Sequence, residues 1–307
     1  MQLAYIVKVH KNPAQVRRMV SRLHFAGATF LIAVDKRADL KEFQKELARL
    51  PSQIPCRWVL PSQDGTWGEI GIVKSSLQAL EAALALPTEP EQIFQISGQC
   101  YPIKPIAALA DFFRSLQGKS MLQCVPLPLP AWPGGGWLRV NKYHYWLPRW
   151  LPFDHGRREF PVDVPPRTLK EWALQRALSW KYPVPRKFPA GLIPCGGHTW
   201  WSMTPALARF ILEFHRRRPE VYEFHRHTLQ PDEIYFSSIV GSFPEWRAQT
   251  VDQFLHYCDW APPIHPAVLT MAYAPVLQSS HYLLARKFDA AVDARILDWI
   301  DANLLGL

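Results

Sequence analysis

Short apolar runs alternate with amphipathic segments over the first third of the chain. Runs rich in β-branched and aromatic residues, which predict buried strands, cover residues 3–9, 29–34, 57–60 and 92–96. Apolar residues at helical spacing, which predict helices, cover residues 13–25, 40–50 and 71–86. Strands that alternate with helices in this way predict an α/β fold, with a mostly parallel central sheet flanked by helices.

The predicted strands are followed by polar residues at their carboxyl ends. His10 follows the first strand, Asp35 follows the second, and residues 97–102 form a turn after the strand at 92–96. Ligands of open parallel sheets bind beyond the carboxyl ends of the strands. These positions therefore mark where a ligand site is expected, without yet indicating its chemistry.

The middle of the chain has a different pattern. Residues 121–195 hold 13 of the 29 prolines and six of the 13 tryptophans, with three consecutive glycines at 134–136. This composition excludes most regular structure, apart from a helix predicted at residues 169–180. A loop of this length within a compact domain is commonly functional. The alternative is a proline-rich insertion that does not touch a substrate.

Regular patterning resumes after residue 195. Helices are predicted at residues 205–217, 231–240 and 290–304, and strands at residues 268–271 and 283–289. We interpret residues 1–307 as one domain with three parts: a nucleotide-binding half (1–115), a Pro/Trp-rich insertion on the acceptor side (121–195) and an acceptor and catalytic half (196–307).

The charge balance is basic: 35 Lys and Arg against 26 Asp and Glu give a formal charge of +9. Such a surface attracts phosphates, anionic lipids or nucleic acid. The densest basic run, HRRRP at 215–219, is interpreted as a solvated helix face, with a membrane or polyanion contact as the alternative. No nucleic-acid recognition motif accompanies the charge, so a nucleic-acid partner is not expected.

The five cysteines are widely spaced and include no CxxC pair. This spacing argues against a disulfide framework and structural zinc, and it is typical of a reducing compartment. The N-terminal MQLAYIVKVHKNP lacks the pattern of a signal peptide, and no window is long and apolar enough to span a membrane. We therefore expect a cytoplasmic protein, with peripheral contact at the inner face of the membrane as a further possibility.

Several chemical motifs are absent from the sequence: GxGxxG, the Walker loop, HExxH, GxSxG and Asp-x-Asp. Many α/β enzymes that use sugar nucleotides hold a divalent cation on the diphosphate with an Asp-x-Asp pair. An enzyme of that kind built from this sequence would have to neutralise the diphosphate with Lys and Arg. No metal site and no cofactor are therefore expected.

The most promising acidic residue is Glu233, in LQPDEIYF (229–236). Proline followed by carboxylates is ordinary helix-start chemistry, and by spacing alone this is the favoured interpretation. The alternative is a base that accepts a proton from a hydroxyl. Lys287 of ARKFD (285–289) is interpreted as a surface lysine, with a ligand contact as the alternative. Trp67 is interpreted as a core residue, with a platform on which a base stacks as the alternative.

Seven segments, taken in order, resemble the core-2/I-branching β-1,6-N-acetylglucosaminyltransferase family, which includes the peptide O-xylosyltransferases. They are AYIVKVH (4–10), IAVDKR (32–37), TWGEIGIVKSSLQAL (66–80), QISGQCYPIKP (95–105), GGHTWWSMTPALARFIL (196–212), PDEIYFSSIV (231–240) and ARKFD (285–289). The resemblance covers nearly the whole chain except the Pro/Trp-rich middle and residues 241–265.

The resemblance implies a GT-A-type α/β fold, a UDP-sugar donor, inversion at the anomeric carbon and no metal. It assigns Glu233 as the catalytic base and Lys287 to the departing diphosphate. By the same resemblance, the donor-binding residues are His10, Asp35, Trp67, Ser97, Gly98, Arg286 and Lys287, and the acceptor-binding residues are Trp200, Trp201 and Asp232. GlcNAc is the favoured donor sugar and xylose the alternative, and the acceptor is a glycan, a lipid-linked glycan or a protein.

The sequence departs from the family pattern at two positions. Cys100 stands where the family usually has Asp, and Ala267 stands where the family tends to place an Arg on the diphosphate. Arg286 or His265 is expected to compensate for the missing arginine. If neither does, the alternative is a non-catalytic relative that binds a UDP-sugar or a glycan.

Overall fold

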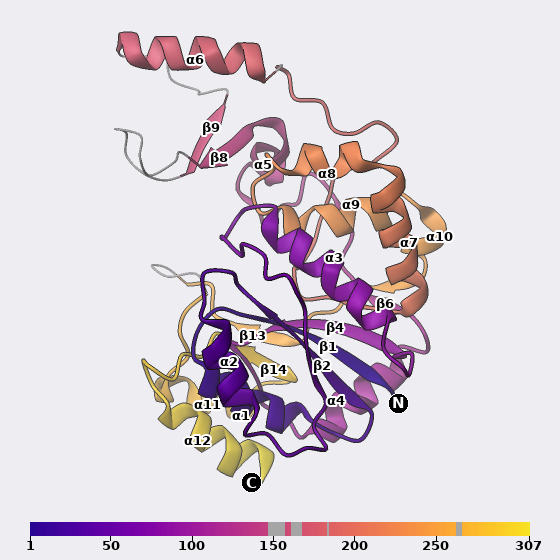
Figure 1. The fold of residues 1–307 in the computed structure, drawn as a ribbon, viewed down its shortest axis with the longest axis vertical. Coiled ribbons are helices and arrows are strands. Elements are labelled where there is room, and N and C mark those ends of the chain that lie inside the picture. Colours follow the sequence, from indigo (N-terminus) through magenta and orange to yellow (C-terminus); the bar gives the residue numbers. More distant parts are fainter. Residues whose placement is uncertain (147–156, 161–167, 183, 262–265) are drawn as a thin grey trace.

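The computed structural model describes residues 1–146, 157–160, 168–182, 184–261 and 266–307. A seven-stranded sheet lies at its centre, in the order β12-β6-β11-β4-β1-β2-β3 (Figure 1). Its strands in chain order are β1 (Leu3–Val9), β2 (Ala28–Val34), β3 (Cys56–Trp58), β4 (Gln92–Ser97), β6 (Ser120–Met121), β11 (Ser202–Met203) and β12 (Thr250–Val251). All neighbours are parallel except those of β11, which is antiparallel to both β4 and β6. The predicted α/β class with a mostly parallel sheet is confirmed.

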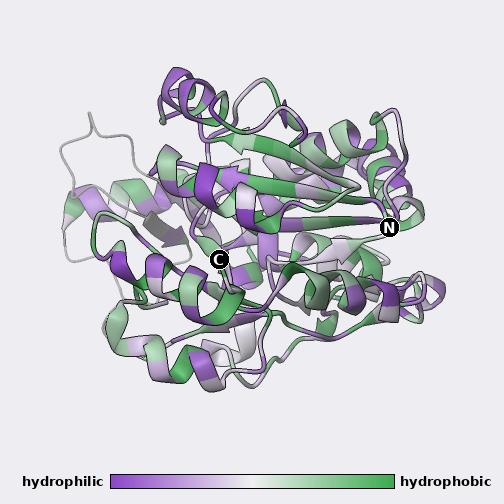
Figure 2. Cartoon of the chain, turned by 90° about the horizontal axis from the view of Figure 1, so that it is seen from below, coloured by the Kyte–Doolittle hydropathy of each residue, from purple (hydrophilic) through white to green (hydrophobic). Residues whose placement is uncertain are grey.

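Helices cover both faces of this sheet. The helices that pack against it or follow it are α1 (Pro13–Leu23), α2 (Leu40–Leu47), α3 (Gly71–Leu84), α4 (Ile106–Ser115), α7 (Pro205–Arg217) and α12 (Arg295–Ile300). Alternate residues of β1 divide between the two faces: Leu3, Tyr5 and Val7 pack with α1, α2 and α12, whereas Ala4 and Ile6 pack with α3 and α7. Figure 2 shows the apolar strands enclosed between helices of mixed character.

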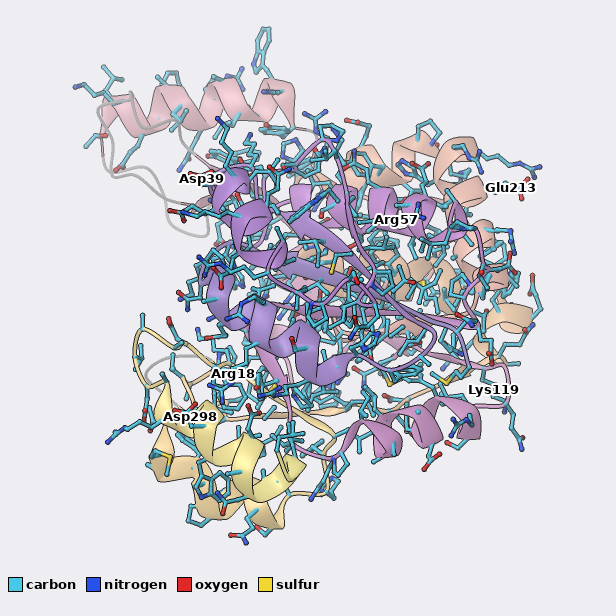
Figure 3. All side chains as sticks on the ribbon, turned by 60° about the horizontal axis from the view of Figure 1, so that its bottom comes forward. Arg18, Asp39, Arg57, Lys119, Glu213 and Asp298 are labelled. Carbon is cyan, nitrogen blue, oxygen red and sulfur yellow. The ribbon has the colours of Figure 1, made fainter. Side chains whose placement is uncertain are left out.

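A second sheet of three strands, in the order β13-β14-β5, lies beside the first. Its strands are β5 (Cys100–Pro102), β13 (His256–Cys258) and β14 (Leu284–Arg286). The C-terminal segment after it, α12 and the π-helical turn η4 (Asp301–Leu305), is anchored by ion pairs to α1. Buried Asp301 accepts hydrogen bonds from Arg18, Arg22 and the hydroxyl of Tyr101. Figure 3 shows Arg18 beside Asp298, to which it donates at 2.6 Å.

Two short elements pack against α12: η3 (Met271–Tyr273) and α11 (Ala274–Ser279). The remaining elements form the part of the molecule that carries the insertion. They are β7 (Val125–Pro126), η1 (Pro133–Gly136), α5 (Trp137–Asn141), β8 (Tyr143–Trp146), β9 (Arg157–Phe160), α6 (Leu169–Lys181), β10 (Cys195–Gly196), α8 (Pro219–His225), η2 (Pro231–Glu233), α9 (Tyr235–Gly241) and α10 (Pro244–Arg247). No helix of the described residues is long and apolar enough to cross a membrane.

Three local predictions are wrong. Residues 121–195 contain more regular structure than their proline content suggested, because short strands and turns fit between the prolines. Residues 268–271 form no strand, although the N–H of Leu269 donates to the carbonyl of Lys287. The helix predicted at 231–240 is divided, so that Glu233 ends a 3-10 turn and α9 begins at Tyr235.

Candidate active site

The carboxyl edge of the main sheet brings His10, Asp35 and Ser97 to one region, as the sequence predicted from three separate strands. β1, β2 and β4 are adjacent and parallel, so their ends meet. The charges of Asp35 and Asp289 both act on the imidazole of His10. Its pKa is nevertheless lowered, because partial burial and the neighbouring Lys11 disfavour the imidazolium. His10 therefore lies in this site as a neutral ring at pH 7.

The Asp35 carboxylate anchors the loop that carries Trp67. It accepts hydrogen bonds from Arg37 (Nη2 at 2.7 Å) and from the backbone N–H of Gly65 at 3.0 Å. These bonds lower the pKa of Asp35 although burial opposes them. Trp67 follows this loop with 62 % of its surface exposed, so the core alternative does not apply. The contacts of Asp35 and Trp67 with a uridine ring stay predictions.

The turn after β4 is fixed by packing. A Cβ on Gly98 would lie 2.7 Å from Val16, and both backbone groups of Gly98 already bond, its N–H to Lys8 O and its carbonyl to Gln15. Gly98 therefore allows a close approach to α1, and its contact with a donor stays a prediction. Ser97 is buried next to it, where its hydroxyl lies 3.4 Å from the Sγ of Cys100.

Cationic groups gather where the C-terminal segment meets this edge. Buried Gln15 donates to the carbonyl oxygens of Gly98 and Phe288, and so joins the turn to the ARKFD segment. Lys11 donates to Asp289 at 2.6 Å, on the same segment. The pKa of Lys287 is lowered by partial burial first, and then by the positive charges of Arg286 and Lys11. The carboxylate of Asp289 partly offsets these charges, and the three cations with this one carboxylate leave a net positive charge that favours an anionic ligand.

Arg286 is the cation at the centre of the second sheet. Its neighbours in register are Cys100 on β5 and Cys258 on β13, so no carboxylate stands beside it in the sheet. Its guanidinium carbon lies 4.6 Å from the centroid of the Trp200 ring, and its buried Nε has no hydrogen-bond partner among the described residues. The arginine is thus held in position with a donor group left over for a ligand.

Glu233 lies across from these cations, at the end of η2. The turn begins after Gln230, which has a left-handed φ of 52°. The carbonyl of Glu233 accepts a 2.8 Å hydrogen bond from the N–H of Gly197, where a Cβ would clash with Gln123 O at 2.2 Å. The Gly-Gly pair of the 196–212 segment thus allows the chain to approach Glu233 closely. The Glu233 carboxylate pairs with Arg139 Nη1 at 2.5 Å.

The pKa of Glu233 is raised to about 7. Burial is the largest cause and the charge of Asp232 adds to it, while Arg139 and Arg286 oppose them. Since the charge of Arg286 lowers the pKa of this carboxylate, the base candidate lies within electrostatic range of the cation group. A carboxylate with a pKa near the working pH is well suited to accept a proton from a hydroxyl. The helix-start interpretation is therefore incomplete, because Glu233 lies in a site with the electrostatics of a base.

Half-buried Lys8, on β1, lies within electrostatic range of Asp232, and it was not identified as a site residue from the sequence. Its Nζ donates to the carbonyl of Ile72 at 2.8 Å and to the hydroxyl of Ser76 at 2.6 Å. Burial lowers the pKa of Lys8 to about 7, and the charge of Asp232 partly restores it. Asp232 itself is buried beside Glu233. Its main effect in the structure is electrostatic, and its contact with an acceptor stays a prediction.

The two adjacent tryptophans assigned to the acceptor have different positions. Trp201 is 1 % exposed and packs against Phe236 in the core, so it cannot touch an acceptor and that prediction is wrong. Adjacent residues of an extended segment point to opposite faces, so the two tryptophans could not both line the same site. Trp200 is half-buried under Arg286, which makes it a neighbour of the donor-side cations.

Arg139 is the site residue that sequence reasoning missed. It comes from α5, inside the insertion, and its guanidinium stacks 3.6 Å from the centroid of Trp132. Trp132 in turn packs on Gly196, where a Cβ would meet its ring at 2.8 Å. Nothing in the spacing of the Pro/Trp-rich segment marks this arginine, because its partner lies 94 residues further along the chain. His265, the other expected compensating residue, lies outside the described residues.

Arg139→Gln is expected to raise the pKa of Glu233 above about 7, since the arginine charge lowers that pKa. In an activity assay, the acidic limb of the pH profile would move to higher pH, and activity at pH 8 would be less affected than activity at pH 6. Arg114→Gln is the matched control, because Arg114 forms a 2.5 Å ion pair with Asp111 on α4. An unmoved limb in Arg139→Gln would contradict this electrostatic role.

Comparison with known proteins finds related glycosyltransferases. Residues 3–131 match the model of the Core-2/I-Branching enzymes. Over 333 aligned residues the chain is 22 % identical to Xylosyltransferase 2 of Canis lupus familiaris, covering 99 % of this chain and 34 % of that protein. Xylosyltransferase oxt of Drosophila melanogaster is 23 % identical over 252 residues, or 80 % of this chain and 25 % of that protein. The chain is thus similar to the core-2/I-branching enzymes. The chain thus spans about a third of the length of its curated relatives or less.

Solved structures show a more distant likeness to this chain. Mouse xyloside xylosyltransferase 1 in its apo form aligns with a TM-score of 0.41 and 12 % identity, over 92 % of this chain and 96 % of that one. TarS 1–349 of S. aureus in complex with UDP-GlcNAc aligns with a TM-score of 0.28 and 12 % identity, over 47 % and 39 % of the two chains.

Proposed function

We propose that this protein transfers a sugar from a UDP-sugar to a hydroxyl acceptor with inversion at the anomeric carbon. The observation that carries the proposal is Glu233, a half-buried carboxylate whose pKa is raised to about 7 and which lies within electrostatic range of Arg286. A direct displacement requires a base and an anion-binding group near one another. The match of residues 3–131 to the Core-2/I-Branching enzymes supports the same reaction class.

The reaction moves one proton and exchanges one bond. The acceptor hydroxyl gives its proton to the Glu233 carboxylate while its oxygen forms a bond to C1 of the donor sugar. The bond from C1 to the diphosphate oxygen breaks on the opposite face, and its electron pair leaves with UDP. Holding the two substrates in line contributes a large part of the rate enhancement in reactions of this kind.

The departing diphosphate is stabilised by protein cations in this proposal, without a metal ion. Lys287 lies beside Arg286 and Lys11, and the mutual repulsion of the three groups is relieved by a bound dianion. Arg286 takes the role of the arginine missing at Ala267. The backbone of Ala267 does lie next to Lys287, since the Lys287 N–H approaches the Ala267 carbonyl at 3.4 Å. Cys100 in place of the usual Asp leaves the charge of Arg286 available for the diphosphate.

The sugar moved is GlcNAc in our first proposal, and xylose is the second candidate because the curated relatives are named xylosyltransferases. The acceptor is a glycan, a lipid-linked glycan or a protein. We place the reaction in the cytoplasm, and the five free thiols support this proposal.

A panel of UDP-GlcNAc, UDP-xylose, UDP-glucose and UDP-galactose, with UDP release as the measurement, separates the donors. We expect the greatest turnover with UDP-GlcNAc, and turnover with UDP-xylose alone would favour the second candidate.

The non-catalytic alternative has its own test in the same assay. A protein that only binds would be protected from thermal unfolding by UDP and would release none from any donor. The raised pKa of Glu233 argues against this alternative, because a binding site gains nothing from a carboxylate poised to accept a proton.

A further inference from the structure

Helix α6 (Leu169–Lys181) stands apart from the rest of the molecule. It lies at one end, beyond β8 and β9 and away from the helices that cover the sheet (Figure 1). None of its 13 residues is buried. Its start is well formed, because the Thr168 hydroxyl and the Glu171 carboxylate complete a capping box. A helix of this length that buries little of its surface is marginal in water, so a further contact would stabilise it.

The outward face of α6 carries three large apolar side chains. Leu169 is 80 % exposed, Trp172 is 55 % exposed and Trp180 is 82 % exposed. Their positions, separated by three and by eight residues, lie along one side of a helix with 3.6 residues per turn. Leu174 and Leu178 are only partly exposed and belong to another side. The outward face, defined here as Leu169, Trp172 and Trp180, therefore exposes two indole rings that the fold does not use.

Cations lie within and beside this face. At 3.6 residues per turn, exposed Arg176 lies between Trp172 and Trp180, and exposed Lys170 and Lys181 lie to one side of them. The one acidic residue of α6, Glu171, is engaged in the capping box with Thr168. The chain as a whole carries a formal charge of +9. Tryptophan with lysine and arginine is the combination that favours the boundary between lipid headgroups and acyl chains, where the indole ring is inserted and the cations meet anionic phosphates.

We propose that the outward face of α6 docks onto an anionic lipid surface, with the helix lying in the plane of the headgroups. The charge of the helix selects this occupant over an apolar protein groove, since three cations beside two tryptophans would remain partly desolvated there. Thirteen residues give a contact about 20 Å long at 1.5 Å per residue. This surface is independent of the transfer site, and either proposal can fail without the other.

The test is co-sedimentation of the full chain with vesicles of phosphatidylcholine containing phosphatidylglycerol, and with phosphatidylcholine alone. We expect binding to the anionic vesicles, weaker binding as salt is raised, and at least about tenfold weaker partitioning for Trp172→Ala/Trp180→Ala. Lys170→Gln/Arg176→Gln/Lys181→Gln should lose the preference for anionic lipid. Val276→Ser/Val292→Ser, which removes exposed apolar residues near the opposite end, should bind as the unaltered chain does.

Each other result overturns the proposal. Absence of binding to anionic vesicles, or equal binding by the double tryptophan variant and the unaltered chain, would remove the outward face as a lipid contact. Sedimentation velocity without lipid gives a second arm: self-association that Trp172→Ala/Trp180→Ala abolishes would assign the face to a second copy of the chain. UDP-dependent thermal stabilisation of the same variants, expected to be unchanged, separates these outcomes from failure of the transfer site or of folding.

Discussion

Glu233→Gln is expected to slow sugar transfer by ~10²–10⁴-fold, the range that removal of a general base usually produces. The substitution keeps the shape of the side chain and its place at the end of η2, where the N–H of Gly197 holds the backbone. A neutral amide, however, cannot take up the proton of the acceptor hydroxyl. Because Glu233 faces the cations of the donor side without belonging to them, UDP affinity should change little. Rates of UDP release with acceptor present, and UDP binding by calorimetry, measure the two effects separately.

The pH profile of the unaltered protein belongs to the same prediction. The pKa of Glu233 is raised to about 7, mainly by burial. Below that pH the carboxyl is protonated and cannot act as a base, so kcat/KM should fall about tenfold per pH unit on the acidic side. Above it the base is ionised and this limb should be flat. An acidic limb near pH 4.5, or none, would mean that another group takes the proton.

The control for Glu233→Gln is Glu213→Gln. Glu213 lies on α7 and its side chain points into solvent, where it pairs with Arg217 at 2.5 Å (Figure 3). The substitution removes the same charge from the same residue type without changing the candidate site. Transfer at the unaltered rate by Glu233→Gln would refute its role, and an equal loss in Glu213→Gln would show that the effect is one of net charge.

The central sheet was predictable because its signals are local. The strand predicted at residues 3–9 matches β1, and the helix predicted at 205–217 matches α7, since an apolar run or stripe reports the burial of its own segment. β11 and β12 were missed because each has two residues, too few to show a period. Their place in the sheet depends on pairing with distant strands, which no local pattern encodes.

The candidate site was predictable for residues whose place in the fold follows from their own segment of the chain. His10 and Asp35 end strands, and the ends of adjacent parallel strands must meet. Arg139 was not predictable, because its side chain reaches Glu233 from an insertion of irregular composition. Trp201 was assigned to the site although the structure buries it in the core. A sequence resemblance marks a position along the chain, whereas the direction of the side chain depends on how the segment pairs with β4.

Lys287→Met is expected to slow transfer by ~10²–10³-fold and to weaken UDP binding, as removal of one group that stabilises a developing anion does. The ammonium of Lys287 lies in a group with Arg286 and Lys11 and forms no ion pair within the described part of the chain. Its charge therefore has no evident structural partner, and the free energy that it contributes is realised when the diphosphate is bound. Lys119→Met is the control, because Lys119 points into solvent at the other side of the molecule (Figure 3).

The stability of the ligand-free protein should change in the opposite direction. The pKa of Lys287 is lowered in the folded state by burial and by like charges, so the protonated form is less favourable there than in the unfolded chain. At pH 7 the charged lysine thus costs folding free energy, and Lys287→Met should raise the melting temperature without UDP while reducing the increase that UDP produces. A purely structural lysine would give a lower melting temperature in the variant. A rise without UDP, a smaller shift with UDP and slow transfer together occur only if Lys287 is a charge held for the donor diphosphate.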